Sequence, residues 1–189
     1  MGAVFALLLL IVGIGGWLVT GPAPTEECGT RQIKVSPEAA ASLDDKIAAF
    51  ERQIDEAAEG EVLILEITEE EATSKVAQLA KEGRISLEMN YIQIHFTDNS
   101  MCGSALVDLL IDMQVVIQAT IRVEDGKPDI TIEGLHLGRI PIPKTLIDNV
   151  MTALEKEVED RWEALPIEFE QINIENGEMI IIGRVKQTS

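Results

Sequence analysis

The sequence predicts an α+β fold in which a long, curved antiparallel sheet wraps on amphipathic helices, preceded by one transmembrane helix. Over residues 105–123 every odd-numbered residue is apolar and most even-numbered residues are polar. Alternation with a period of two is typical of a strand that buries one face. Apolar residues at three- and four-residue steps over residues 147–165 predict a long helix with one apolar stripe.

The strand over residues 105–123 is the longest predicted element of the sheet. Most strands have five or six residues. At about 3.3 Å per residue, an unbroken strand of this length would extend about 60 Å. We therefore expect it to curve or to contain bulges, and to wrap around another element.

The N-terminal residues 3–19 are apolar throughout, which is close to the shortest length that spans a bilayer. A cleaved signal peptide is the competing interpretation. Against cleavage, no lysine or arginine precedes the apolar run, and no A-x-A site follows it. We expect a transmembrane anchor over residues 1–20, a linker over 21–35, and an α+β extracytoplasmic domain over 36–189.

An acidic domain after the anchor suits a single-pass protein of the cell membrane whose C-terminal domain lies outside the cytoplasm.

Two helices are expected at the start of this domain. Ser36 is a suitable N-cap with Pro37 at the first helical position, and an apolar stripe continues towards Gly60. The stripe comprises Leu43, Ile47, Phe50 and Ile54.

A short apolar strand over residues 62–67 follows the first helix. Thr68 and Glu71 then form the capping-box pattern that opens a second helix, in which each side chain bonds to a free backbone amide of the first turn. Gly83 is expected to end this helix.

Breaks in the alternation predict where the sheet bends. Apolar residues switch from odd to even positions near Tyr91-Ile92, which indicates a β-bulge or a bend, and another parity shift occurs at Gly134. Two dipeptides, Asp125-Gly126 and Asn176-Gly177, are strong hairpin signals. A further turn is expected at residues 98–100, and the Ile-Pro-Ile-Pro run at 140–143 is expected to break the sheet.

Composition excludes several function classes. The chain has 33 acidic and 15 basic residues, a net charge of −18, and only 4% aromatic residues. These values argue against nucleic acid as a partner, and against attraction to anionic headgroups by charge alone. Lipid could still be held through apolar contacts, which need no basic patch.

No residue pattern indicates catalysis, a cofactor or a metal site, so we expect a non-enzymatic protein. His95 and His136 alternate with inward positions and are expected on the surface. On one extended strand Asp108 and Asp112 would lie about 13 Å apart, beyond the separation of glycosidase carboxylate pairs of about 5–9.5 Å. The acidic runs at 69–71 and 155–160 are interpreted as a helix start and a solvated helix face.

The chain has two cysteines, Cys28 and Cys102. Outside the cytoplasm such a pair permits a disulfide, which would tie the linker to the start of the long strand. Two free thiols are the alternative, and two cysteines alone are too few for a metal site.

Three stretches carry a family resemblance. Residues 67–73 (ITEEEAT) open a helix, residues 123–127 (VEDGK) form a turn before 137–143 (LGRIPIP) and a long helix, and residues 172–184 close with a hairpin. Together they resemble bacterial membrane-anchored proteins of the LmeA and YpmS kind, which are similar to the tubular lipid-binding (TULIP) superfamily. The resemblance implies a twisted sheet around a long helix and non-catalytic phospholipid binding, with a lipid-binding-like core over about 61–189. The helix over 36–59 departs from this pattern.

The apolar faces either fill a solid core or leave a groove between the long strand and the long helix. For a groove, the predicted lining comes from both elements. The candidates are Met113, Val115, Ile117, Ile121, Ile147, Met151, Leu154 and Val158. We expect a membrane-tethered, extracytoplasmic lipid-binding or lipid-handling protein that takes a phospholipid acyl chain; the alternative is a scaffold or interaction domain with a solid core, no ligand and an unidentified protein partner.

Overall fold

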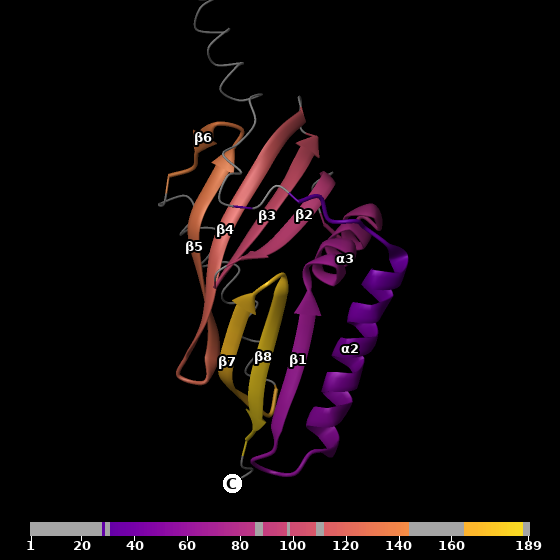
Figure 1. Ribbon diagram of the computed structural model, residues 1–189, viewed down its shortest axis with the longest axis vertical. Helices are drawn as coiled ribbons and strands as arrows, with labels where there is room; N and C mark the ends of the chain where they lie inside the picture. The colour runs from indigo at the N-terminus through magenta and orange to yellow at the C-terminus, as the bar shows by residue number, and fades with distance from the viewer. Residues whose placement is uncertain are drawn as a thin grey trace, which may run out of the picture.

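The computed structural model describes residues 28, 31–85, 89–97, 99–108, 112–143 and 165–186. Over these residues the chain forms an α+β fold with two antiparallel sheets and two helices (Figure 1). Neither of these helices is long and apolar enough to cross a membrane. The expected anchor over 1–20 and nearly all of the expected helix over 147–165 lie outside the described residues.

The strands form two sheets, so the prediction of one long sheet is wrong. Three strands pair in the order β1-β8-β7, and five pair in chain order from β2 to β6. The C-terminal hairpin therefore joins the early strand β1 and leaves the long alternating segment to the other sheet. The three-stranded sheet comprises β1 (Val62–Thr68), β7 (Ile167–Glu175) and β8 (Glu178–Val185). The five-stranded sheet comprises β2 (Met89–Thr97), β3 (Ser100–Asp108), β4 (Asp112–Glu124), β5 (Lys127–Leu137) and β6 (Ile140–Pro141).

The expected long strand over residues 105–123 is in fact a hairpin of β3 and β4. The ladder pairs Asp108 with Asp112 and continues to Ser100 with Thr120. The numbers of each pair sum to 220, so odd-numbered residues pair with odd-numbered ones. Since directly paired residues share a face, the alternation passes through the turn without a change of parity. A period-two pattern cannot distinguish this hairpin from one long strand.

The two helices begin as expected. The Ser36 side chain accepts a hydrogen bond from the backbone of Ala39 and caps α2 (Pro37–Glu56). Thr68 and Glu71 form the complete capping box of α3 (Glu69–Lys81). Within the predicted stripe of α2 only Ile47 is exposed, while Leu43, Phe50 and Ile54 are buried.

The predicted bends are confirmed where the alternation breaks. The β2–β3 register shifts between Asn90 and Gln93, and the β4–β5 register shifts next to Gly134. The two Asx-Gly dipeptides form two-residue hairpin turns in which both central residues have positive φ, as their backbone twist requires. Residues 140–143 do not break the sheet at once, because β6 first pairs with β5.

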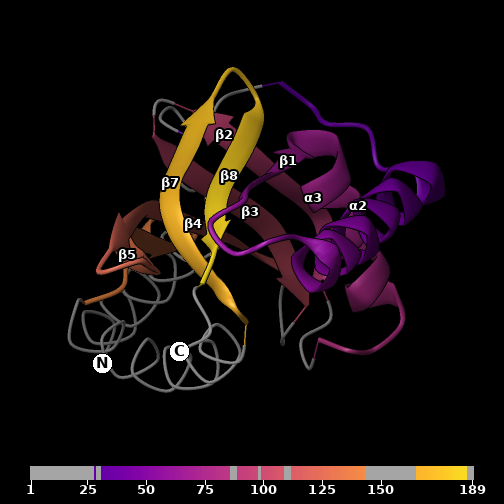
Figure 2. The ribbon, with the colours of Figure 1, turned by 90° about the horizontal axis from the view of Figure 1, so that it is seen from below.

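The main core lies against the three-stranded sheet. Phe50 and Ile54 of α2 pack there with Leu63 of β1 and with buried residues of β7 and β8. In Figure 1, α2 runs beside β1 and α3 beside β2. Figure 2 shows the hairpin of β7 and β8 in front of the five-stranded sheet. In this view α2 and α3 lie together to the right of the hairpin. Two backbone bonds join the sheets, from Phe169 to Gly126 (2.9 Å) and from Asn99 to Ile174 (2.8 Å).

Candidate functional site

One face of the five-stranded sheet, which we call the apolar face, carries only apolar side chains. The ladders pair Met113 with Val107 and Val115 with both Ala105 and Leu137, so these residues share a face. Next to the two-residue turns, odd-numbered residues of β3 and β4 pair with even-numbered residues of β2 and β5. Beyond the two bulges, odd-numbered residues pair with odd-numbered ones again. The apolar face comprises Met89, Ile94, Phe96, Met101, Ala105, Val107, Met113, Val115, Ile117, Ala119, Ile121, Val123, Pro128, Ile130, Ile132, Leu135, Leu137 and Ile140.

The four strand candidates for a lipid groove lie together on this face. Met113 is buried, whereas Val115, Ile117 and Ile121 are only half-buried, as are most other aliphatic residues of the apolar face. The four helix candidates lie outside the described residues. They are Ile147, Met151, Leu154 and Val158.

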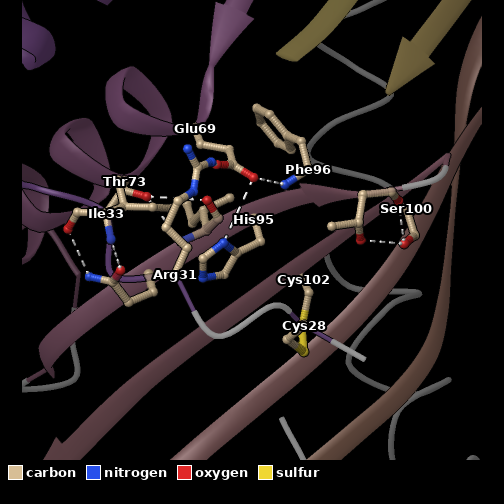
Figure 3. A network of polar contacts seen from close by, with 12 residues as sticks. Cys28, Arg31, Ile33, Glu69, Thr73, His95, Phe96, Ser100 and Cys102 are labelled. Carbon is tan, nitrogen blue, oxygen red and sulfur yellow. Dashed lines mark hydrogen bonds and ion pairs between the residues drawn. A yellow bond between two sulfur atoms is a disulfide. The ribbon is translucent and has the colours of Figure 1, made fainter. Parts of the chain in front are cut away.

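The opposite face of the sheet is mostly polar and is crossed by the segment that enters the domain. Cys28 and Cys102 are joined by a disulfide, with their Cα atoms 5.2 Å apart, and both are buried with Val116. Further along, the Gln93 side chain accepts from the Ile33 amide (2.6 Å) and donates to the Ile33 carbonyl (3.2 Å). These contacts, shown in Figure 3, hold the entering segment against β2 and β3.

At the outer edge of β2, side chains of α3 and not another strand supply hydrogen-bond partners for the backbone. Glu69 accepts a hydrogen bond from the Phe96 amide (2.7 Å). One helical turn later, the Thr73 hydroxyl accepts from the Ile94 amide (3.0 Å) and bonds to the Ile94 carbonyl (3.4 Å). Residues four apart on a helix lie on one face and are separated by about 6 Å, close to the spacing of alternate residues on a strand.

Glu69 also joins three parts of the chain. Its carboxylate pairs with the Arg31 guanidinium, and its backbone amide donates to the Gly177 carbonyl (3.0 Å) in the β7–β8 turn. The sequence interpretation of residues 69–71 as a helix start is correct but incomplete, since the Glu69 side chain is only 6% exposed.

The expectation that His95 lies on the surface is wrong. The segment over residues 31–33 covers this face, and His95 is buried with Nδ1 3.8 Å from the Glu69 carboxylate. Burial lowers the pKa of His95 by disfavouring the charged imidazole; the Glu69 charge opposes this and the Arg31 charge adds to it. The imidazole is therefore neutral at pH 7. His136 is half-buried on the same face.

Glu71 is a second buried carboxylate with a structural role. Burial raises its pKa, but hydrogen bonds from Lys46 (2.8 Å), the Thr68 amide (3.0 Å) and Ser42 (2.7 Å) outweigh that effect and lower the pKa overall. The charged form is thus held in place between α2 and α3, which suits a cap and not a proton donor.

The hairpin changes the geometry of one acidic pair. Asp108, the last residue of β3, lies directly opposite Asp112, the first residue of β4, so the separation predicted for them along one strand is wrong. Both side chains are exposed. Among the described residues, no group of three or more His, Cys, Asp or Glu side chains could hold a metal ion.

A groove of about 840 Å³ lies where α3, the start of β2 and the entering segment meet, and we call it the β2 groove. Its walls are mostly aliphatic or amide side chains. Tyr91 stands at the bulge with φ +50° and 77% exposure, and Val35 is 47% exposed. The lining comprises Gln32, Ile33, Lys34, Val35, Ala77, Ala80, Lys81, Met89, Asn90, Tyr91, Ile92 and Gln93.

The charge of the β2 groove differs from that of the chain. Lys34 and Lys81 line it and no carboxylate does, although the net charge of the chain is −18. Three basic residues outside the groove lining are paired with carboxylates on or near α2 and α3: Arg31 with Glu69, Lys46 with Glu71, and Lys75 with Asp44. The predicted bulge was the one signal in the sequence that pointed here, because a bulge re-aims a side chain at a sheet edge.

No protein-family model matches this chain, and neither a curated protein nor a solved structure does. The class that the geometry defines is an α+β domain with one wholly apolar sheet face and a disulfide-fixed entry segment.

Proposed function

We propose that this protein is a membrane-tethered, extracytoplasmic lipid-binding or lipid-handling protein without catalytic activity. A phospholipid acyl chain would lie along the apolar face of the five-stranded sheet. The sequence pattern of residues 1–20 supports the tether, and the resemblance to TULIP-like proteins supports the ligand class.

The apolar face is the observation that carries this proposal. Its side chains come from all five strands of the sheet, and Val115, Ile117 and Ile121 are typical in being half-buried. Apolar area left in water costs about 25 cal/mol per Å², so an apolar ligand that covers such a face is stabilised by its burial. A phospholipid acyl chain supplies that cover without any polar group to satisfy.

The disulfide supports an extracytoplasmic location. Cys28 and Cys102 are joined in the structure, and disulfides persist in oxidising compartments.

Lipid binding is tested on the full chain purified from membranes, by native mass spectrometry and by lipid extraction. Two neighbouring residues on opposite faces of β4 give a matched pair of variants. Ile121→Asn should lower the lipid content several-fold, because it places an amide against the acyl chain, whereas Arg122→Asn should leave it unchanged.

A second variant separates ligand loss from misfolding. Val115→Phe adds only apolar volume to the same face, so it should compete with the acyl chain while the thermal transition stays near that of the unchanged protein. Wild-type protein without bound phospholipid, or equal lipid content in all three variants, would contradict lipid binding.

An interaction domain remains a second candidate because of one observation on β1. Val62 and Ile64 are exposed, Ile64 by 60%, and Ile64 pairs with the half-buried Ile182 on the outer face of the three-stranded sheet. If this face recruits a protein and the core holds no ligand, Ile64→Asp should abolish capture of that protein, whereas Ile121→Asn on the apolar face should leave it unchanged.

A further inference from the structure

We propose that the mouth of the β2 groove docks on the surface of the bilayer that carries the protein's own anchor. The contact residues are Lys34, Val35, Lys81 and Tyr91. This inference rests on the proposed membrane tether, but not on lipid held by the apolar face.

The entry path places the groove near the membrane. The disulfide fixes Cys28 on β3, eight residues after the expected end of the anchor at residue 20. An extended chain covers at most about 3.5 Å per residue, so Cys28 lies within about 28 Å of the bilayer surface. The segment then runs to Ile33, which Gln93 holds at the edge of the groove.

The distances along the sheet are short. Cys102 pairs with His95, and Ser104 pairs with Gln93, so the disulfide and the groove are two residues apart on neighbouring strands. Two residues of a strand span about 7 Å. The tether therefore keeps the near edge of the groove within about 35 Å of the bilayer surface.

The groove mouth has the residue types of a membrane interface. Tyr91 and Val35 are exposed, and tyrosine favours the boundary between apolar chains and water. Lys34 and Lys81 have no ion-pair partner among the described residues, and no carboxylate lines the groove. Near an anionic surface the lysines attract headgroups, while the rest of this acidic chain is repelled.

The backbone keeps Tyr91 in this position. Its φ of +50° is uncommon for a residue other than glycine, and it lies within the bulge between Asn90 and Gln93. The bulge turns the Tyr91 side chain outward at the sheet edge, where it is 77% exposed.

The experiment uses the full chain in nanodiscs of phosphatidylcholine and phosphatidylglycerol in equal parts. Because both native cysteines are in the disulfide, a fluorophore can be attached to one introduced thiol. Gln32→Cys places the fluorophore in the groove. Asp55→Cys places it at the C-terminal end of α2, about 27 Å along the helix axis from Pro37. Quenching by headgroup-labelled nitroxide lipid should be strong at position 32 and weak at position 55.

Charge variants test which residues dock. A lysine near an anionic surface shifts the equilibrium about fivefold, so Lys34→Gln with Lys81→Gln should lower the ratio of docked to free domain about twenty-five-fold. Arg52→Gln with Arg122→Gln removes the same charge from exposed positions elsewhere and should leave this ratio unchanged.

Several results would overturn the docking proposal. Equal lipid quenching at positions 32 and 55 would do so. Position 32 shielded from aqueous iodide but not quenched by lipid would assign the groove to a soluble ligand, a protein or a second copy. A chain that does not co-elute with the discs would remove the tether and the docking together. Docking with no lipid on the apolar face would instead contradict only the acyl-chain proposal.

Discussion

Replacing Thr73 with valine removes the hydroxyl that satisfies the edge of β2 and keeps the shape of the side chain. Thr73 is completely buried, and its hydroxyl bonds to both the amide and the carbonyl of Ile94. Without it, these two backbone groups lose their side-chain partner inside the protein.

The magnitude follows from the two distances. A buried polar group without a partner costs about 1–3 kcal/mol. The amide bond at 3.0 Å is well formed and the carbonyl contact at 3.4 Å is long, so the amide dominates and the expected loss is about 2–3 kcal/mol. Thr73→Ser keeps the hydroxyl and loses one methyl group, which costs about 1 kcal/mol.

The assay is thermal unfolding of the full chain in detergent, followed by circular dichroism. For a domain of this size, 1 kcal/mol shifts Tm by about 2–4 °C, so Thr73→Val should lower Tm by about 5–10 °C and Thr73→Ser by about half as much or less. Thr131→Val, at an exposed position on β5, serves as the control and should leave Tm nearly unchanged. A valine variant more stable than the serine variant would refute the reasoning, because packing would then outweigh the two hydrogen bonds.

Two further predictions concern the entry segment. Replacing both Cys28 and Cys102 with serine should lower the free energy of unfolding by roughly 4 kcal/mol, since the disulfide closes a loop with a sequence separation of 74; an unchanged Tm with and without reductant would contradict this. The pKa of His95 is lower in the folded protein than in the unfolded chain, so the unfolded chain binds more protons below about pH 6.5 and stability should fall as the pH drops through that range. His95→Asn should flatten this dependence between about pH 6.5 and the lowered folded-state pKa, and an equal slope in both proteins would rule out His95 as its source.

Local features of the fold could be predicted from the sequence because their causes are local. Ser36 and Thr68 cap the helices through amides three residues away. The hairpin turns at Asp125-Gly126 and Asn176-Gly177 depend on positive φ at neighbouring residues. The bulges at Tyr91 and Gly134 are visible as changes of parity.

The functional elements were predictable only in part. The alternation identified Met113, Val115, Ile117 and Ile121 as one face, and the hairpin keeps them on it. The β2 groove could not be predicted, because residues 32–35 of its wall are distant in sequence from the walls at 77–81 and 89–93.

The sequence by itself determined which side chains share a face, where the two helices begin and where the two Asx-Gly hairpins turn. Only the tertiary structure decided that residues 105–123 fold back as β3 and β4, that β8 pairs with β1, and that Glu69 and His95 are buried. The physical reason is that the β3–β4 hairpin pairs odd-numbered residues with odd-numbered ones, so it preserves the period of two. Strand pairing and burial, in contrast, depend on residues far away in the chain.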